Sequence, residues 1–458
     1  MSLKLSRILH AGYVFECEGR QIAFDPIFEN PFSRNCHAFP DVRFDLDQIR
    51  QARFAAVFIS HFHDDHCSME SLDLLDRSTP IYLYCQFEAM FDMIRALGFR
   101  QVHALQVDVE VTLGPFTVTA REAIDADVDA MFQVRAGGMN VLNVVDAWIA
   151  PVAMRELAAQ APWDMVLWPF QTMREVEVLS PSRARPEPVT LPEEWIDQLR
   201  KLDPRYIVPS SCQFVQETWS WYNHAFFPIS YRQFQADIEA ALPGARVARL
   251  NPGVAVVLDA TGLSTAAPLS WVLPVGEQDV DYDYRPDLPA PTSAQIATRF
   301  PALDAAQAAR VQAFCQHGLL EKYRAMELEE GGYFDQPRLW RLSLYDHEGA
   351  CVQWHYRVVG DSIALAQEGS APLAWTTEIS QHKLYAALEL GESLTSLYLR
   401  INDMVFAPPE EAALEDAELV DDPLIRCLFN DAFGAYQAAQ LRRLGVRWQD
   451  CTDQETGG

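Results

Sequence analysis

The six residues 61–66 read His-Phe-His-Asp-Asp-His and carry four side chains that bind metal ions, those of His61, His63, Asp65 and His66. In an extended loop, residues two positions apart point the same way, so His61 and His63 can bind one ion together. Asp65 and His66 come where the chain turns into the next element, and they can bind a second ion nearby. Imidazole nitrogens and carboxylate oxygens are ligands of zinc, iron and manganese. The spacing therefore predicts a site for one or two divalent metal ions.

A buried strand and a helix flank this loop and must position it. Residues 54–60 form a continuous apolar run, which predicts a central strand, and residues 68–77 have helical spacing. Upstream, residues 13–26 predict a hairpin closed by Asp25 and Pro26. Further strands are expected at 80–85, 116–122, 130–136, 139–146, 204–211 and 245–250. Strands in two groups with helices between them predict an α/β protein, with two sheets packed face to face and helices covering them outside.

The chain has 458 residues, which is too long for one compact core, so we expect two domains. Residues 1–262 form the metal-binding domain, and residues 263–295, rich in Pro, Asp and Ser, read as a linker. Residues 296–458 predict a smaller α+β domain of unknown role. Its expected elements are helices at 303–326, 380–390 and 423–444, strands at 339–346, 352–359, 362–367 and 396–401, and a solvated acidic loop at 410–422.

The motif HxHxDH at 61–66 resembles the hallmark of the metallo-β-lactamase superfamily, and the resemblance covers roughly residues 5 to 260. It implies an αββα sandwich, here followed by the smaller α+β domain. Asp25, in the segment IAFDP, matches the early aspartate of the superfamily, which orients the metal ligands. Asp146, in the segment VLNVVDAW, matches the aspartate that bridges both metals.

Two histidines of the superfamily pattern are missing. Where the third histidine would stand, the chain has Asp125, with Asp127 and Asp129 close by. The resemblance therefore makes Asp125 the expected ligand beside His61 and His63. Where the last histidine would stand, the chain has Ser210, Ser211 and Cys212. Cys212 is either a thiolate ligand in place of that histidine or a buried cysteine near the site.

Two further histidines lie near the expected pocket. His10, in the segment ILHAGY, is placed in the first strand and is expected to orient ligands or to pack, rather than to bind metal. His224, in the segment WSWYNHAFFP, either contacts metal or substrate, as a catalytic residue beside Asp65, or packs among the aromatic side chains around it.

The chain also resembles the lactamase-like part of CMP-sialic acid hydroxylase. The shared features are the strand before Asp146, the segment PRYIVP followed by a loop without histidine, and the segment RLNPGVAVVL. That hydroxylase carries a Rieske iron–sulfur domain with ligands spaced CxH and CxxH. Here Cys315 and His317 fall inside a predicted helix, and Cys351 and His355 are too far apart, so we predict no Rieske cluster.

These features support a metal-dependent hydrolase of a small-molecule ester, lactone, amide or phosphoester, in which paired ions turn a bound water into hydroxide. Asp65 or another carboxylate would hold the proton. The first alternative is a non-haem iron oxygenase, because two histidines and one carboxylate are the ligand set of many such enzymes. The second alternative, motivated by the two missing histidines, is a relative that has lost catalysis.

Composition limits the partners. With 36 basic and 64 acidic residues the net charge is −28, which argues against nucleic acid or an anionic membrane as the main partner. The nine scattered cysteines without a CxxC pair predict reduced intracellular thiols, and no signal peptide or membrane-spanning apolar run is evident, so we expect a cytoplasmic protein. The expected partner is a small-molecule substrate. A homo-oligomer and, for an oxygenase, an electron-donor protein are the protein partners that fit these interpretations.

Overall fold

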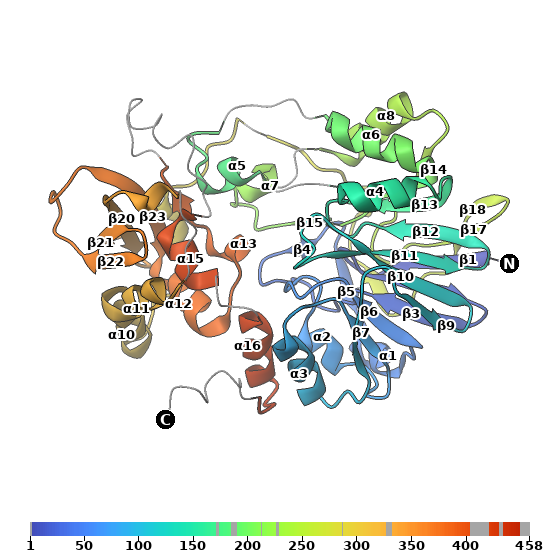
Figure 1. Cartoon of the computed structure of the whole chain (residues 1–458), viewed down its shortest axis with the longest axis horizontal. Helices are drawn as coiled ribbons and strands as arrows, with labels where there is room; N and C mark the ends of the chain where they lie inside the picture. The colour runs from blue at the N-terminus through green and yellow to red at the C-terminus, as the bar shows by residue number, and fades with distance from the viewer. Residues whose placement is uncertain are drawn as a thin grey trace.

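The computed structural model describes residues 2–170, 174–184, 190–211, 213–225, 229–285, 287–326, 332–403, 421–429 and 434–448. In this part of the chain, two large sheets lie face to face in the N-terminal region, and a third sheet forms a separate C-terminal region (Figure 1). The division into 1–262, 263–295 and 296–458 stays a prediction. The segment expected to be a linker contains two short strands, of which one extends the first large sheet and the other pairs with a strand near residue 43.

The first sheet has eight strands in the order β18-β17-β1-β2-β3-β6-β7-β8. Their bounds are β1 (Ser2–Arg7), β2 (Tyr13–Cys17), β3 (Arg20–Phe24), β6 (Ala56–Ile59), β7 (Ile81–Leu83), β8 (Val102–Ala104), β17 (Ala255–Asp259) and β18 (Gly262–Ala266). Strands β2 and β3 form the expected hairpin, and β6 lies parallel between β3 and β7. Every residue of β6 is buried, because a central strand in the parallel part of a sheet is covered on both faces.

The second sheet has seven strands in the order β16-β14-β13-β12-β11-β10-β9. Their bounds are β9 (Glu110–Leu113), β10 (Phe116–Glu122), β11 (Ala130–Ala136), β12 (Met139–Asn143), β13 (Trp163–Trp168), β14 (Pro204–Pro209) and β16 (Arg246–Val247). The inner faces of the two sheets meet in an apolar core. In it, the ring of Phe24 lies 5.1 Å from that of Phe132, and 5.3 Å from that of Phe58 in the next strand of its own sheet. Face-to-face sheets bury the alternate apolar residues of their strands in this way.

Helices cover the outer faces of the sandwich (Figure 1). Those beside the first sheet are α1 (Leu46–Gln51), α2 (Met69–Asp73) and α3 (Glu88–Ala96), and those beside the second are α4 (Pro151–Ala158), α6 (Glu193–Leu202) and α8 (Tyr231–Ala241). The predicted α/β sandwich is therefore confirmed.

The C-terminal region is built on a five-stranded sheet in the order β22-β21-β20-β23-β24. Its strands are β20 (Arg338–Tyr345), β21 (Cys351–Val359), β22 (Ser362–Leu365), β23 (Leu373–Ser380) and β24 (Arg400–Ile401). Helices α10 (Ala305–Ala313), α11 (Leu319–Ala325), α12 (Gln381–Leu390) and α15 (Pro423–Phe429) pack with it. A π-helical turn at Phe314–Gly318 joins α10 to α11 within the predicted helix 303–326.

Two elements of this region differ from their predictions. The expected strand 396–401 is mostly the short helix α13 (Leu394–Leu397), and only Arg400–Ile401 pairs as a strand. Its apolar residues are buried on all sides, which gave them the pattern of a strand. The expected helix 423–444 is two helices, α15 and α16 (Ala435–Arg443), with Gly434 at a positive φ of 74° between them. Of the predicted loop 410–422, only its last two residues lie in the described part of the chain.

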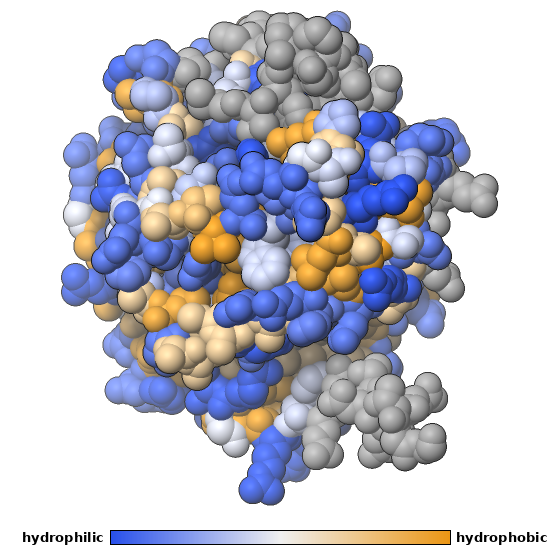
Figure 2. Space-filling view, turned by 90° about the vertical axis from the view of Figure 1, so that its left-hand side faces the viewer, coloured by the Kyte–Doolittle hydropathy of each residue, from blue (hydrophilic) through white to orange (hydrophobic). Residues whose placement is uncertain are grey.

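The surface of the C-terminal side is mostly hydrophilic. Figure 2 looks onto that side and shows apolar side chains as small groups separated by polar ones among the coloured atoms. Among the described residues, no helix is both long enough and apolar enough to cross a bilayer.

Candidate metal centre

The loop 61–66 begins where β6 ends, at the carboxyl edge of the first sheet. Asp25 follows the neighbouring strand β3 and lies beside the start of this loop, with a positive φ of 39°. Its Oδ1 accepts the backbone N–H of Ser60 at 2.7 Å, and its Oδ2 accepts the hydroxyl of Ser60 at 2.8 Å. Two adjacent strands therefore fix the point at which the loop leaves the sheet.

The same two residues orient two of the loop histidines. Asp25 Oδ2 lies 3.1 Å from His66 Nδ1, and Ser60 Oγ lies 2.9 Å from His61 Nδ1. With their Nδ1 atoms engaged, both rings turn their Nε2 atoms towards the other site residues. Partners of this kind fix the tautomer and the orientation of metal-binding histidines. That Asp25 orients metal ligands stays a prediction from the resemblance.

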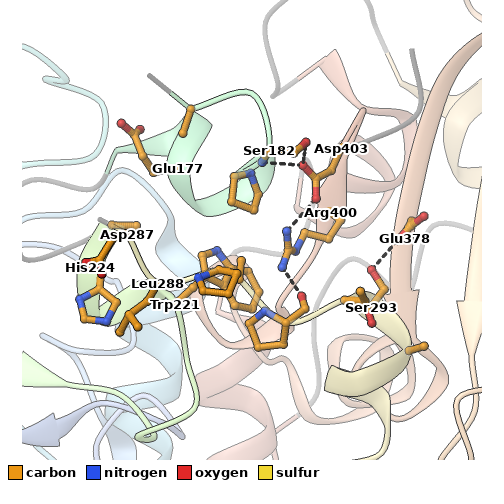
Figure 3. Close-up of a pocket in the computed structure, with 18 of the residues that line it drawn as sticks. Glu177, Ser182, Trp221, His224, Asp287, Leu288, Ser293, Glu378, Arg400 and Asp403 are labelled. Carbon is orange, nitrogen blue, oxygen red and sulfur yellow. Dashed lines mark hydrogen bonds and ion pairs between the residues drawn. The ribbon is translucent and has the colours of Figure 1, made fainter. Parts of the chain in front are cut away.

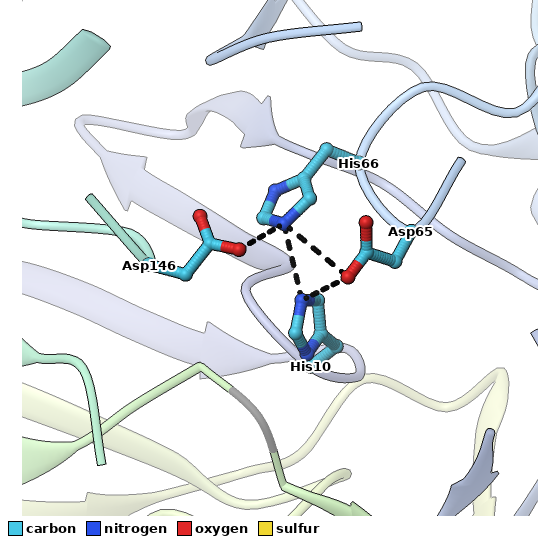
Figure 4. Close-up of side chains that lie close together, drawn as sticks. All are labelled: His10, Asp65, His66 and Asp146. Carbon is cyan, nitrogen blue, oxygen red and sulfur yellow. Dashed lines mark hydrogen bonds and ion pairs between the residues drawn. The ribbon is translucent and has the colours of Figure 1, made fainter. Parts of the chain in front are cut away.

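One group of donor atoms comprises His10, Asp65, His66 and Asp146, whose ligand atoms all lie within 4.8 Å of one another (Figure 4). His66 Nε2 lies 3.0 Å from Asp146 Oδ2 and 3.7 Å from Asp65 Oδ2. His10 Nε2 lies 3.1 Å from both His66 Nε2 and Asp65 Oδ2. These four residues could hold one ion.

His10 joins this group because of a tight turn after β1. The strand ends at Arg7, so His10 lies beyond it and not in the first strand as expected, with a φ of 49°. The buried guanidinium of Arg7 donates to the carbonyl of His10 and, at 2.9 Å, to that of Ser210. A Cβ at Gly12 would come within 2.8 Å of the carbonyl of Asp25, so the turn requires glycine there.

Ser210 stands where the superfamily pattern has its last histidine, and its hydroxyl lies 2.9 Å from the hydroxyl of Tyr13. His10, near the N-terminus, thus supplies an imidazole to the group with Asp65, His66 and Asp146, whereas the missing histidine would have come from residue 210. The hydrophobic pattern around His10 does not indicate a metal ligand, and only the resemblance of the segment ILHAGY to the superfamily makes His10 a candidate.

A second group comprises His61, His63 and Asp65. The ring centroids of His61 and His63 lie 4.4 Å apart. Asp129, which precedes β11, approaches this group, with its Oδ1 3.8 Å from His61 Nε2. Because Asp65 belongs to both groups, the two candidate ion positions are adjacent.

The other candidate residues lie elsewhere. Asp125 is exposed and belongs to neither group, while Asp129, four residues later, is at the position beside His61. His224 is half-buried in α7 (Tyr222–Ala225), where its Nδ1 accepts the backbone N–H of Arg285 at 3.1 Å, and it also belongs to neither group. Cys212 lies outside the described residues.

The donor set fits divalent cations. His61 Nε2, Asp129 Oδ1 and Asp146 Oδ1 are buried, and none has a hydrogen-bond partner within the part of the chain that the structure describes. Buried polar atoms without partners are rare in folded proteins, and here they belong to ligand-type side chains within one cluster. A mixture of imidazoles and carboxylates suits zinc, iron or manganese. We conclude that the residues present could bind one or two such ions.

The electrostatics of the cluster agree with this. Burial lowers the pKa of His61, which keeps its imidazole in the neutral form that binds metal. The pKa of His63 is lowered too, by its partly desolvated ring, although its side chain reaches solvent. Burial, together with the nearby charge of Asp146, raises the pKa of Asp129 to about 7. Burial opposes the charged form of Asp146 too, but the adjacent His66 lowers its pKa. A cation would relieve the crowding of these carboxylates.

Comparisons with known proteins give structural likeness only. No family model matches the chain, and no curated protein matches it. One similar solved structure is Igni18, a metallo hydrolase from Ignicoccus hospitalis, at 17% identity and a TM-score of 0.39 over 57% of this chain and 99% of that one. Another is an isothiocyanate hydrolase from Delia radicum gut bacteria, at 14% identity and a TM-score of 0.40 over 55% of this chain and 98% of that one.

A third similar structure is CmlA, a diiron β-hydroxylase from Streptomyces venezuelae, at 15% identity and a TM-score of 0.37 over 56% of this chain and 54% of that one. TM-scores this low carry no argument by themselves. The fold follows from the chain's own architecture. Two sheets lie face to face with helices outside, and the motif HxHxDH lies at the carboxyl end of a central strand. These features define a metallo-β-lactamase fold with a metal-binding site.

Proposed function

We propose that the protein is a metal-dependent hydrolase that acts on a small-molecule ester, lactone, amide or phosphoester. The observation that carries the proposal is the pair of adjacent donor groups that share Asp65. His61, His63 and Asp129 would hold one ion, and His10, Asp65, His66 and Asp146 would hold the other. Two ions side by side generate a nucleophile from water at neutral pH and polarise the carbonyl or phosphoryl group under attack.

The protein's own residues contribute orientation and a proton acceptor. Asp25 and Ser60 hold the rings of His66 and His61 in the orientation that directs both Nε2 atoms to the cluster. Asp65, which lies between the two groups, or another carboxylate of the cluster would hold the proton of the attacking water. Burial of His10, His61 and His66 keeps bulk water away from the donor atoms.

A second candidate function is an iron-dependent oxygenase. The observation that favours it is the carboxylate of Asp129, 3.8 Å from His61 Nε2, which would form a set of two histidines and one carboxylate with His61 and His63. Because we predict no Rieske cluster, an oxygenase of this kind would take its electrons from a separate protein or from the substrate.

The test is metal analysis coupled to two activity assays. The protein is purified without oxygen, its zinc, iron and manganese are quantified, and hydrolysis of ester, lactone, amide and phosphoester substrates is measured beside oxygen uptake. We expect hydrolysis that rises with metal content and is lost in His63→Ala. The control His347→Ala changes an exposed histidine of a turn and should behave as the wild type. Oxygen uptake with iron and without hydrolysis would establish the oxygenase, and metal-free protein without either activity would reject both.

A further inference from the structure

A large cavity lies between the N-terminal sandwich and the C-terminal sheet (Figure 3). Its volume is about 780 Å³, which is the size of a small-molecule binding site. Its walls come from α5 (Glu175–Leu179) and the turn after it, from α7 and the residue before it, from residues 284–285 and 287–294, and from strands β20, β23 and β24. None of the donor residues of the metal centre lines it.

One side of the cavity is apolar. It is formed by the indole of Trp221 and by short apolar and proline side chains. These are Pro181, Ala184, Ala225, Leu288, Pro289, Ala290 and Pro291. Such a surface takes up the apolar part of a ligand because burying it removes both surfaces from water. Trp221 is itself fixed, since its Nε1–H donates to the carbonyl of Val178 at 3.0 Å.

The other side is a polar face of the C-terminal sheet. Glu378 of β23 is paired directly with Arg400 of β24, and Thr376 is paired with Arg341 of β20. Because alternate residues of a strand share a face, Arg341, Glu378 and Arg400 project from the same side of the sheet. The opposite face carries Trp340 and Thr377, which are hydrogen-bonded to each other at 2.9 Å.

Most charges in the cavity wall are already compensated. Arg400 lies over the ring of Trp221 and forms an ion pair with Asp403 at 2.7 Å, and Arg285 pairs with Asp287 at 2.9 Å. Arg341 forms no ion pair among the described residues. Among the described residues, Glu378 accepts one side-chain hydrogen bond, from the hydroxyl of Ser293 at 2.5 Å. Arg341 is therefore a cation of the wall without an ion-pair partner among the described residues, and Glu378 lies opposite Arg400, whose guanidinium already forms an ion pair with Asp403.

Buried donors without partners lie on the same face. Among the described residues, the buried Nε atoms of Arg341 and Arg400, both in the cavity wall, have no hydrogen-bond partner, and neither has Thr376 Oγ1, which lies beside Arg341 on the same face of the sheet. An unsatisfied buried polar group costs free energy, so two such guanidinium nitrogens on the wall of a cavity indicate that a bound molecule completes their hydrogen bonds. A ligand that satisfies guanidinium N–H donors must bring acceptor oxygens.

We infer that this cavity binds an α-amino acid with an apolar side chain. The carboxylate accepts from Arg341, the ammonium group donates to Glu378, and the side chain lies against Trp221. Arg341 and Glu378 occupy diagonal positions on the adjacent parallel strands β20 and β23, one strand spacing and two residues apart, roughly 8 Å at the backbone, so both can reach one small zwitterion. A simple anion would meet Glu378 without compensation, and a simple cation would meet Arg341 in the same way.

Calorimetric titration with matched probes tests this. L-leucine is compared with 4-methylpentanoate, which lacks the ammonium group, with 3-methylbutylamine, which lacks the carboxylate, and with glycine, which lacks the apolar part. We expect L-leucine to bind at least tenfold more tightly than each of the three. Equal binding of either single-charge probe, or no binding of L-leucine at millimolar concentration, would overturn the assignment.

Two variants locate the site. Arg341→Gln and Glu378→Gln should each weaken binding of L-leucine about tenfold or more, as expected when one charge-assisted hydrogen bond is lost. The controls Arg357→Gln and Glu368→Gln change exposed residues outside the cavity wall and should bind as the wild type does. Circular dichroism verifies that each variant is folded, and the two independent variants keep the test decisive if one of them is not.

The metal centre is the competing location for an amino acid. The titration is therefore repeated with His63→Ala, which we expect to leave L-leucine binding unchanged while it lowers the metal content. Loss of binding in His63→Ala, with binding retained in Arg341→Gln, would place the ligand at the metal centre and overturn the inference. That outcome would leave the proposed hydrolase intact.

Discussion

The side-chain amide of Gln437 donates a hydrogen bond to the backbone carbonyl of Phe62 at 2.7 Å, although 375 positions separate the two residues. The same Nε2 donates to the carbonyl of Cys67 at 2.9 Å. Phe62 and Cys67 flank the segment His63 to His66, so one buried amide holds both ends of the metal-binding loop. Helix α16 of the C-terminal region thus stabilises the conformation that brings the loop ligands together.

A second glutamine of α16 extends this contact. Gln440 accepts the backbone N–H of Met69 at 2.7 Å and donates to the hydroxyl of Ser68 at 2.8 Å, at the start of α2. Ser393 of the C-terminal region also donates to the carboxylate of Asp64 at 3.1 Å. The C-terminal region therefore belongs to the support of the metal centre.

Replacing Gln437 should weaken metal binding. Gln437→Leu keeps the side chain's size but leaves the carbonyls of Phe62 and Cys67 without this donor, at a cost of roughly 1–3 kcal/mol for each buried group. We expect metal affinity to fall about tenfold or more, measured by competition with a chromophoric chelator. The matched control is Gln198→Leu, another buried glutamine, on α6. Equal metal affinity in the two variants would show that α16 does not support the loop.

His10 provides a test of the ion held with Asp65, His66 and Asp146. In His10→Ala, this group loses one of its two imidazoles, and we expect about one metal equivalent fewer per chain by elemental analysis. The control His347→Ala, at an exposed turn, should retain the metal content of the wild type. Unchanged metal content in His10→Ala would return His10 to the packing or orienting role that the sequence predicted.

Substitutions of Asp129 and Asp125 test which carboxylate helps His61 and His63 to bind the other ion. Asp129 Oδ1 is buried, has no hydrogen-bond partner among the described residues and lies 3.8 Å from His61 Nε2, whereas the side chain of Asp125 is exposed. Asp129→Asn should therefore reduce metal binding by His61 and His63 about tenfold or more, while Asp125→Asn should change it less than twofold. If Asp125→Asn reduced metal binding and Asp129→Asn did not, Asp125 would be the ligand, as expected from the sequence.

Glu29 should make stability depend on pH. Burial raises its pKa above the ordinary 4.5, while Ser71 donates to its Oε1 at 2.9 Å. As the pH rises through 4.5, the unfolded chain releases this proton before the folded protein does. The contribution of Glu29 to stability therefore falls with rising pH and levels off above its folded pKa.

Glu29→Gln keeps an acceptor oxygen for Ser71 but does not titrate. We expect this variant to gain stability relative to the wild type as the pH rises from about 4.5, in denaturant titrations of both metal-loaded proteins. Taking the difference between the two proteins cancels the effect of pH on metal binding. A difference that stays constant, or that shrinks as the pH rises, would contradict the raised pKa.

The sequence by itself determined the parts of this protein that depend on local pattern. The apolar run 54–60 predicted the central strand β6, because a strand covered on both faces has no polar alternation. The spacing of His61, His63, Asp65 and His66 predicted a metal-binding loop, because neighbouring positions in a short loop share one location in space. Asp25 and Asp146 followed from the same superfamily pattern.

Tertiary structure decided what depends on segments distant in the sequence. His10 reaches the cluster through a tight turn held by Arg7 and Ser210, and Asp129 stands beside His61 because of how the chain enters β11. Gln437 reaches the loop from the last described helix. No local periodicity encodes such contacts, because they arise only when strands and helices pack and bring their ends to one edge of a sheet.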